Sequence, residues 1–419
     1  MKFVMIRPSY IPEISGGNHL AMDLVEDAAK SGDEVVLIVP FPERVSDEVK
    51  RECESKIDEV QFGGKVQIHR IRSRFGEGGF AVRALRMGEL SLRMLGRALS
   101  EKDADALISH SMPVFLGPLS AVAGKLRGIP VVYWEQDIVS NSIHSTRLFQ
   151  SSLKSKALYA VARGMERFTS RLSSHVITIS RDFVRRQVEE FGKAADRVSL
   201  LHNWIDVEQV HPVPREENFL FDKYGLDRNA FYVTYCGTLG LPQNVEILVD
   251  AARALQKYPD FRVVIFGGGV REKAVRSYIA DAALPNVQIF PLEPLENAAQ
   301  VYSLGDVGLV IGRKGTSGNG FPSKTWSILA AGQTIVTCFD EGSELEEIVR
   351  KEDCGLCVPP DDSAALTDAL ERLYLDRDLL CRCGIHAREA AVERHSRAAA
   401  TAFFWKTVRE AANRGAGGK

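Results

Sequence analysis

The segment Gly320-Phe-Pro-Ser-Lys-Thr-Trp-Ser-Ile-Leu-Ala-Ala-Gly332 contains a lysine in an electrostatically unfavourable position. Pro322 is suited to the start of a helix, which would place Ser323 and Lys324 in the first turn. A positive charge there opposes the helix dipole. Lys324 is therefore predicted to face an anion, and the alternative is a surface lysine without a role.

Glycine-containing loops are expected after buried strands at three places. They are Gly16-Gly17, Gly237-Thr-Leu-Gly240 and Gly267-Gly-Gly269. Glycine lets a ligand approach the backbone, and a following helix offers unpaired N–H groups to phosphate oxygens. None of the loops fits Gly-x-Gly-x-x-Gly or a Walker loop, which disfavours nicotinamide dinucleotides and P-loop chemistry. Gly16-Gly17 taken alone could equally be a flexible turn.

The elements that must position these loops are short apolar runs alternating with helical patterns. Consecutive apolar positions rich in Val and Ile are typical of strands buried on both faces of a parallel sheet. The runs are 2–6, 34–39, 66–71, 106–109, 130–134, 175–179 and 198–202, then 231–236, 261–266, 287–290, 307–311, 334–339 and 356–358. Two such series predict two doubly wound α/β domains.

The proline-containing segment 203–214 is interpreted as the linker between the two domains. The expected domains are residues 1–205 and 206–395, and a final helix in 396–419 is expected to pack back across the domain junction. Ligands of doubly wound sheets bind at the carboxyl ends of the strands. The sequence therefore predicts that the chemistry lies in the loops after the strands, facing a cleft.

Composition excludes several classes of protein. The chain has 419 residues, 45% of them hydrophobic and 26% charged, and a formal net charge of −2, which is typical of a soluble globular protein and not of a general nucleic-acid binder. Seven cysteines and no secretory signal favour a reducing cytoplasm. The spacings Cys354-x-x-Cys357 and Cys381-x-Cys383 do not predict a zinc site. Asp103-Ala-Asp105 is interpreted as a solvated connection.

Two stretches, 62–99 and 142–172, are rich in Lys and Arg and poor in Asp and Glu. Basic amphipathic helices can lie on anionic membranes, and they can equally be solvated helix faces. No transmembrane segment is expected.

Five ordered motifs resemble those of the retaining GT-B glycosyltransferases of family 4, over nearly the whole chain. They are Pro12-Glu-Ile-Ser-Gly-Gly17, Ser174-His-Val-Ile-Thr-Ile-Ser-Arg181, Leu201-His-Asn-Trp-Ile-Asp206, Ala330-Ala-Gly-Gln-Thr-Ile-Val336 and Cys357-Val-Pro-Pro-Asp-Asp362. Other positions depart from the family. Asn319 and Ser327 replace its two spaced glutamates, and Thr238 and Gln243 replace two cations. Pro322-Ser-Lys324 resembles the branch that contains colanic acid, O-antigen and capsule enzymes.

This resemblance implies transfer of a sugar from a nucleotide diphosphate-sugar, with UDP favoured as the family's commonest donor nucleotide. Lys324 would supply the lost positive charge at the departing diphosphate. Retention is expected without a protein nucleophile, and no metal ion or other cofactor is expected. The donor would contact Gly16, Gly17, Gly237, Thr238, Gly240, Gly268, Leu292, Arg313, Asn319, Ser323, Lys324 and Ser327.

The acceptor side is expected in the first domain. The family places a His-Asp or Gln-Asp pair after a strand, where this chain has Trp134-Glu-Gln-Asp-Ile138. Asp137 and Glu135 are therefore candidates, as is His110 after the preceding strand, although a packed histidine is an equal alternative. A glycan or polyprenyl-linked acceptor and peripheral contact with the inner membrane face are expected. The rival interpretations are a nucleotide-sugar 2-epimerase, a soluble small-molecule transferase and a non-catalytic binding subunit.

Overall fold

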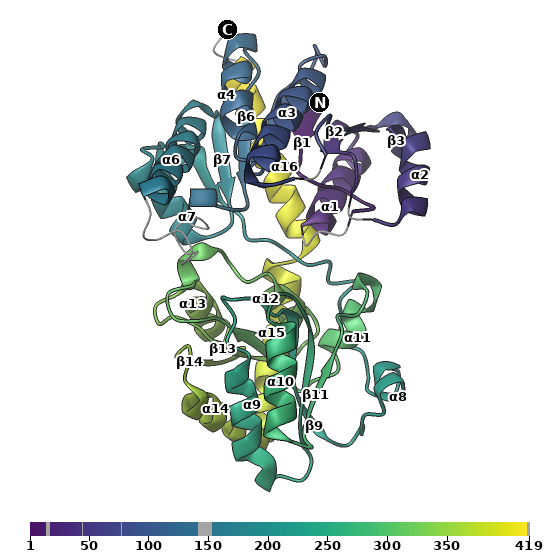
Figure 1. The fold of residues 1–419 in the computed structure, drawn as a ribbon, viewed down its shortest axis with the longest axis vertical. Coiled ribbons are helices and arrows are strands. Elements are labelled where there is room, and N and C mark those ends of the chain that lie inside the picture. Colours follow the sequence, from purple (N-terminus) through teal and green to yellow (C-terminus); the bar gives the residue numbers. More distant parts are fainter. Residues whose placement is uncertain (14–16, 44, 77, 141–152, 417–419) are drawn as a thin grey trace. The chain divides into compact units, whose positions relative to one another are not determined.

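The computed structural model describes residues 1–13, 17–43, 45–76, 78–140 and 153–416. The chain divides into two compact units (Figure 1). The first contains Met1–His202 and Ala400–Lys419, and the second contains Asn203–Ala399. The boundary thus falls slightly before the expected one, and most of the final helix α16 (Arg397–Ala416) belongs to the first unit.

The first unit is built on an eight-stranded sheet with the order β3-β4-β2-β1-β5-β6-β7-β8. All neighbouring strands are parallel except β3, which runs antiparallel to β4. The strands are β1 (Lys2–Ile6), β2 (Glu34–Pro40), β3 (Asp58–Gln61), β4 (Val66–Ile71), β5 (Ala106–His110), β6 (Val131–Glu135), β7 (His175–Thr178) and β8 (Val198–Leu200). The polar strand β3 was not expected, because its four residues carry no apolar run.

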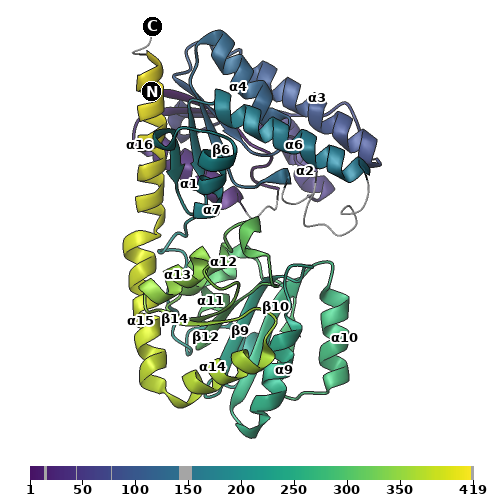
Figure 2. The ribbon, with the colours of Figure 1, turned by 90° about the vertical axis from the view of Figure 1, so that its left-hand side faces the viewer.

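Helices cover both faces of this sheet, as the buried strands require. Figure 2 shows α1 and α16 on one face and α3, α4 and α6 on the other. Trp405 of α16 stacks on Phe3 of β1 at 5.0 Å between ring centroids, and its Nε1 donates to the Leu24 carbonyl at 3.0 Å. The helices are α1 (Asn18–Lys30), α2 (Asp47–Ser55), α3 (Phe80–Ala98), α4 (Leu116–Arg127), α6 (Leu153–Leu172) and α7 (Arg181–Arg185), which continues as the π-turn Arg186–Glu190.

The second unit has a six-stranded parallel sheet with the order β11-β10-β9-β12-β13-β14. Its strands are β9 (Phe231–Thr238), β10 (Phe261–Gly268), β11 (Val287–Phe290), β12 (Val307–Ile311), β13 (Thr334–Cys338) and β14 (Gly355–Val358). One face packs on α9 and α14, and the other packs on α12 and α13. The helices are α8 (Leu220–Tyr224), α9 (Glu246–Ala254), α10 (Glu272–Ala282), α11 (Ala298–Tyr302), α12 (Lys324–Ala330), α13 (Glu344–Lys351), α14 (Ser363–Leu375) and α15 (Arg377–Arg394).

Each sheet has one point where the direction of winding reverses. In the first unit β1 lies between β2 and β5, and in the second unit β9 lies between β10 and β12. Strands on the two sides of such a point send their connections to opposite faces, so the loops diverge and leave room for a ligand. The loops after β1 and β5, and those after β9 and β12, are therefore the places to look for function in each unit.

The segment expected to be a linker is packed against the second unit. Trp204 is buried, and the guanidinium of Arg388 in α15 donates to the carbonyls of Val207 at 3.1 Å and Val210 at 3.2 Å. The Arg397 backbone N–H donates to the Ile205 carbonyl at 3.0 Å, which fastens the segment to the start of α16. These contacts fix the segment in place on the second unit.

The contacts of Trp405 predict that α16 is part of the folding core of the first unit. Trp405→Ala should lower the free energy of unfolding by about 3–5 kcal/mol, because it removes a buried aromatic side chain. Phe403→Ala on the same helix, at a side chain 41% exposed, is the matched control and should change it by less than about 1 kcal/mol. Urea unfolding followed by far-UV circular dichroism measures the free energy of unfolding of both variants. Equal losses of stability in the two variants would contradict this role of α16.

Candidate functional site

Lys324 lies at the switch point of the second sheet. It is the first residue of α12, and its side chain reaches the end of β9, where Nζ lies 3.8 Å from the centroid of the Tyr235 ring. A Cβ atom on Gly237 would come within 2.7 Å of Nζ, so a side chain there would displace the ammonium group from this position. Gly237 also has a φ of +143°, which other residues rarely adopt. The residue type at 237 and the position of Lys324 thus depend on each other.

The ammonium group of Lys324 lacks a counter-ion. Within the part of the chain that the structure describes, its only charge-stabilising contact is the face of Tyr235, a cation–π interaction worth about 0.5–2 kcal/mol. Burial lowers the pKa of Lys324 to about 8, and the nearby Cys236 opposes this shift weakly. Desolvating an unpaired charge is unfavourable unless an anion arrives. This arrangement is suited to binding an anion.

The glycine loop after β9 lies beside Lys324. Thr238 is exposed, while its carbonyl accepts a hydrogen bond from the Tyr235 hydroxyl at 2.8 Å. Gln243, which stands where the family has a cation, accepts from the Gly240 backbone N–H at 3.2 Å. Gln243 thus closes this loop upon itself. The loop is held in shape by its own side chains.

The second glycine run, Gly267–Gly269, spans the end of β10, and its members do not all serve the same purpose. A Cβ on Gly267 or Gly269 would meet Leu239 at 2.7 Å, so these two glycines accommodate that buried leucine. Gly268 instead faces Leu292 Cδ1 at 3.8 Å and Glu272 Oε2 at 3.7 Å from its potential Cβ position. The half-exposed Leu292 thus lies next to Gly268 as an apolar surface at the carboxyl ends of β10 and β11.

The remaining donor-side candidates occupy the same edge of the sheet with distinct roles. Arg313 braces two loops, because its Nε donates to the Leu241 carbonyl at 3.1 Å and its backbone N–H to the Pro242 carbonyl at 2.8 Å. Its side chain is thereby engaged in structure, unlike that of Lys324. Ser323 is the exposed N-cap residue of α12. Ser327 interacts with the buried hydroxyl of Tyr302. Asn319 ends the turn Ser317–Asn319.

The acceptor-side candidates all lie at the carboxyl edge of the first sheet, but only Asp137 is exposed. Its pKa is raised by partial desolvation, and its backbone N–H donates to Ser111 Oγ at 3.1 Å. His110 is buried, accepts from the Met112 N–H at 3.0 Å, and has a pKa held well below its usual range by burial. It is a neutral side chain that shapes the turn after β5.

Glu135 departs from the expectation that it contacts an acceptor. Its side chain is fully buried, and Gln187 Nε2 and Thr178 Oγ1 donate to its carboxyl group at 2.7 Å and 3.1 Å. Burial, with a further contribution from Glu166, raises the pKa of Glu135 to about 8. We assign it to the packing of β6, β7 and the π-turn. Of the first glycine pair, Gly17 is the N-cap residue of α1, and Gly16 lies outside the described residues.

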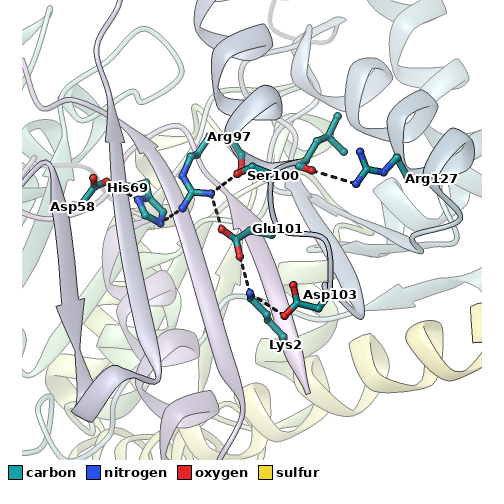
Figure 3. Close-up of polar contacts among 9 residues, drawn as sticks. Lys2, Asp58, His69, Arg97, Ser100, Glu101, Asp103 and Arg127 are labelled. Carbon is teal, nitrogen blue, oxygen red and sulfur yellow. Dashed lines mark hydrogen bonds and ion pairs between the residues drawn. The ribbon is translucent and has the colours of Figure 1, made fainter.

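Asp103 and Asp105 have structural partners near the first strand. Figure 3 shows a chain of polar contacts from Asp103 through Lys2, Glu101 and Arg97. Asp105 Oδ2 accepts from the Lys2 backbone N–H at 2.7 Å. Across the described ranges, no three His, Cys, Asp or Glu side chains form a group suited to a metal ion, and the seven cysteines are unpaired thiols.

The basic helices are less cationic at their surface than their sequences suggest. In α3, Arg93 and Arg97 form ion pairs with Glu89 and Glu101, and in α6, Arg163 pairs with Glu190 at 2.6 Å. Apolar side chains are exposed on α3 instead: Leu85 and Leu92, one above the other along the helix, are 60% and 58% exposed. They line a shallow hollow with Phe75, Arg74 and Phe115.

Sequence reasoning missed two residues of these edges. The sequence analysis placed Tyr235 only within an apolar strand, although its ring makes the cation–π contact with the ammonium group of Lys324. Arg7 follows β1 directly, and its guanidinium is buried over Trp134 at 4.8 Å from the ring centroid. The available signal was its position, since a charged residue immediately after a buried strand lies at the ligand-binding edge.

Two glycosyltransferase family models match successive parts of the chain. Residues 14–209 match the family model described as Glycosyltransferase Family 4, and residues 216–390 match that described as Glycosyl transferases group 1. The chain is 24% identical to the putative colanic acid biosynthesis glycosyl transferase WcaI of Escherichia coli, over 90% of this chain and 92% of that protein. It is 22% identical to a GDP-mannose-dependent alpha-mannosyltransferase of Mycobacterium tuberculosis, over 94% and 93%.

The fold is also that of solved structures. HepE of Anabaena, in complex with UDP and glucose, superposes with a TM-score of 0.71 at 17% identity, over 98% of this chain and 100% of that one. None of the helices in the described residues combines the length and the apolar character needed to cross a membrane.

The assignment of Glu135 to packing predicts a pH-dependent stability. A carboxyl group whose folded pKa is raised to about 8 contributes stability that is present below its ordinary pKa and is lost as pH rises through about 8. Glu135→Gln mimics the protonated form, so it should flatten the fall in melting temperature between about pH 6 and about pH 9. Differential scanning fluorimetry across this range measures it. A variant with wild-type pH dependence would refute the assignment.

Proposed function

Because this chain belongs to family 4 of the GT-B glycosyltransferases, we propose that it transfers a sugar from a nucleotide diphosphate-sugar to a glycan or lipid-linked acceptor in surface polysaccharide assembly. The observation that carries this proposal is the unpaired ammonium of Lys324 against Gly237 and Tyr235. The polysaccharide role is supported by the resemblance to the WcaI protein over nearly the full length of both chains.

The donor's diphosphate would bind beside Lys324 in the second unit. Charge accumulates on the diphosphate as the sugar leaves, and a preorganised cation in a partly desolvated position stabilises such charge strongly. Ser323 is exposed at the same helix end and would add a hydroxyl donor. The loop after β9 presents its backbone there because Gly237 carries no side chain. Lys324, Ser323 and this backbone would together take the place of two family cations, whose positions are occupied by Thr238 and Gln243 in this chain.

The nucleoside would lie toward Leu292 and Gly268. These residues form an open apolar surface at the ends of β10 and β11, and the carboxylate of Glu272 lies beside it. UDP is the proposed nucleotide, supported by the UDP complex of HepE, while the GDP-mannose-dependent relative makes GDP the direct competitor. We further propose that the sugar's configuration is retained, that departure of the diphosphate needs no metal ion, and that Asp137 orients the acceptor hydroxyl.

The lowered pKa of Lys324 makes nucleotide affinity pH-dependent. Only the ammonium form attracts the diphosphate, and with a pKa of about 8 in the ligand-free protein this form is lost as pH rises. The dissociation constant of UDP should therefore increase about tenfold between about pH 7 and about pH 9. Lys324→Arg should remove this dependence, because arginine stays charged throughout. Isothermal titration calorimetry measures the dissociation constant of UDP at each pH. The same titrations are made with GDP, and with either Mg²⁺ or a chelator added.

Lys324→Met should weaken UDP binding at pH 7 by about tenfold or more. Lys273→Met is the matched control, since Lys273 is an exposed lysine in the first turn of α10 in the same unit, and it should bind as the wild type does. Wild-type affinity in Lys324→Met would refute the diphosphate assignment. Binding that requires Mg²⁺ would refute metal independence alone, and a preference for GDP would replace UDP as the donor nucleotide.

A lipid-linked acceptor requires access to a membrane surface, and α3 has suitable side chains for it. Leu85 and Leu92 expose apolar surface along one side of the helix, and the exposed Arg83 and Arg74 lie nearby in sequence. Apolar side chains that enter the headgroup region, together with cations near anionic lipids, are the requirements for interfacial binding. We therefore propose α3 as the membrane-contacting helix, because its exposed Leu85 and Leu92 line one hollow.

The double substitution Leu85→Ser and Leu92→Ser should abolish cosedimentation with phosphatidylglycerol-containing vesicles, because it removes the apolar contribution while leaving the charges. Leu375→Ser, at a side chain 64% exposed in the second unit, is the control and should sediment as the wild type does. Vesicles of phosphatidylcholine alone should bind the wild type weakly. Unchanged sedimentation of the double variant would exclude α3 as the contact.

A further inference from the structure

The hollow on α3 is a feature of the first unit that the proposed reaction does not yet use. Its volume is about 700 Å³, within the range of about 300–1,000 Å³ that is typical of sites for small molecules. Helix α3 forms one side of it, and the segments that follow β4 and β5 form the other. The apolar residues that line this α3 hollow are Phe75, Ala84, Leu85, Gly88, Leu92 and Phe115.

The polar groups of the α3 hollow are engaged with the protein itself. The carboxylate of Glu89 accepts from Ser73 Oγ at 2.8 Å, from Arg93 Nη1 at 3.3 Å and from the Arg74 backbone N–H at 3.4 Å. Across the residues that the structure describes, no side chain lining the hollow has a buried nitrogen or oxygen without a hydrogen-bond partner. A sugar or a peptide would lose hydration here without gaining new partners, whereas a hydrocarbon group loses none. The interior is therefore suited to a hydrocarbon.

The rim of the hollow adds a positive charge. Two arginines, Arg74 and Arg93, and one acid, Glu89, line it, which leaves a net charge of +1. Glu89 and Arg93 form an ion pair, while the side chain of Arg74 is exposed. An apolar interior with a cation at its edge is complementary to an amphiphile that has a hydrocarbon chain and an anionic head group.

The α3 hollow connects the proposed membrane face to the edge of the sheet where the acceptor is proposed to react. Leu85 and Leu92 line the hollow and are also exposed, so it opens on the membrane-contacting side of α3. At the other side lies Phe115, four residues after Ser111, whose Oγ accepts from the Asp137 backbone N–H at 3.1 Å. Four residues of chain span at most about 14 Å, so the end of the hollow at Phe115 lies near the loop that carries Asp137.

We propose that the α3 hollow binds the hydrocarbon chain of a polyprenyl-linked acceptor, whose anionic head group lies beside Arg74. The identity of the chain rests on the proposed function, whereas the site itself rests on its apolar lining, its satisfied polar groups and its charged rim. The hollow would hold the acceptor by a part that does not react and would direct its head group toward the loop after β5. A second copy of the chain would need an interface of about 800 Å² on each partner, much more than this hollow provides.

The test measures how affinity depends on chain length in the full-length protein. Isothermal titration calorimetry is made with geranyl phosphate and farnesyl phosphate, both below their critical micelle concentrations. Because the two probes share one head group, the ratio of their dissociation constants reports the chain alone. Each buried methylene adds affinity, so farnesyl phosphate should bind the wild type about tenfold or more tighter than geranyl phosphate.

Gly88→Leu fills the hollow, because a Cβ at Gly88 meets no heavy atom within 4 Å and the residue belongs to the lining. Gly96→Leu is the matched control, since Gly96 lies on the same helix, has equally open space and is not part of the lining. The ratio of the two dissociation constants should fall to within about twofold of unity in Gly88→Leu and stay at the wild-type value in Gly96→Leu. Both variants should melt at or above the wild type, because each replaces a glycine inside a helix.

Vesicle sedimentation separates the chain site from membrane contact in general. Gly88→Leu adds apolar surface to α3, so it should sediment with phosphatidylglycerol-containing vesicles at least as well as the wild type does. Dodecyl phosphate, an unbranched chain of matching length, tests a phospholipid chain as the occupant. If it binds as tightly as farnesyl phosphate and with the same dependence on Gly88, the hollow takes a chain of the bilayer and the polyprenyl assignment is wrong.

The remaining outcomes distinguish this site from the proposed function. A chain-length dependence that Gly88→Leu removes, in a protein that binds no nucleotide, would support the hollow and refute the proposed function. Nucleotide binding without any chain-length dependence, or with one that Gly88→Leu retains, would refute the hollow alone. A dimer of the lipid-free wild type in analytical ultracentrifugation that Gly88→Leu dissociates would identify a second copy as the occupant and overturn the proposal.

Discussion

Both sheets are buried on both faces, and this constraint determines where polar chemistry can lie. Helices cover each face, so the side chains along β1, β9 and β12 pack into apolar layers that tolerate no unpaired charge. Charged groups can enter only at the ends of the strands, where the chain leaves the sheet. Arg7 directly follows β1, and Lys324 reaches the end of β9 from α12. In each unit, therefore, a buried or desolvated cation lies at the edge where the winding of the sheet reverses.

Lys324 and Arg7 share an energetic pattern. Each is desolvated, each lies over an aromatic ring at the strand edge, and neither has a carboxylate partner in the described residues. Other cations of the same unit or its helices do have carboxylate partners, as Arg97 has Glu101 and Arg163 has Glu190. Stability alone would favour pairing or replacing the two unpaired groups. For Lys324, this cost is the physical argument behind the proposal that an anion binds beside it.

Glycines make these arrangements possible, but they do so in different ways. Gly237 leaves space for an ammonium group and adopts a backbone conformation with positive φ. Gly267 and Gly269 leave space for Leu239, so they serve packing although they belong to a loop of the kind that binds phosphate. A run of glycines in a sequence therefore indicates that another group lies close to the backbone there. Only the folded chain shows whether that group is a ligand, a side chain or another part of the backbone.

The sequence alone determined the fold class, because buried parallel strands have a distinctive apolar pattern, and it predicted function at the edge where such strands end. It also singled out Lys324, because a lysine in the first turn of a helix opposes the helix dipole, and Asp137, because it follows a buried strand. Only the tertiary structure decided that Glu135 is internal, that Arg97 of α3 and Arg163 of α6 are paired, and that Arg7 is buried without a carboxylate partner among the described residues. Those properties depend on residues far apart in the chain, such as Gln187 for Glu135 and Trp134 for Arg7, and no local pattern encodes such contacts.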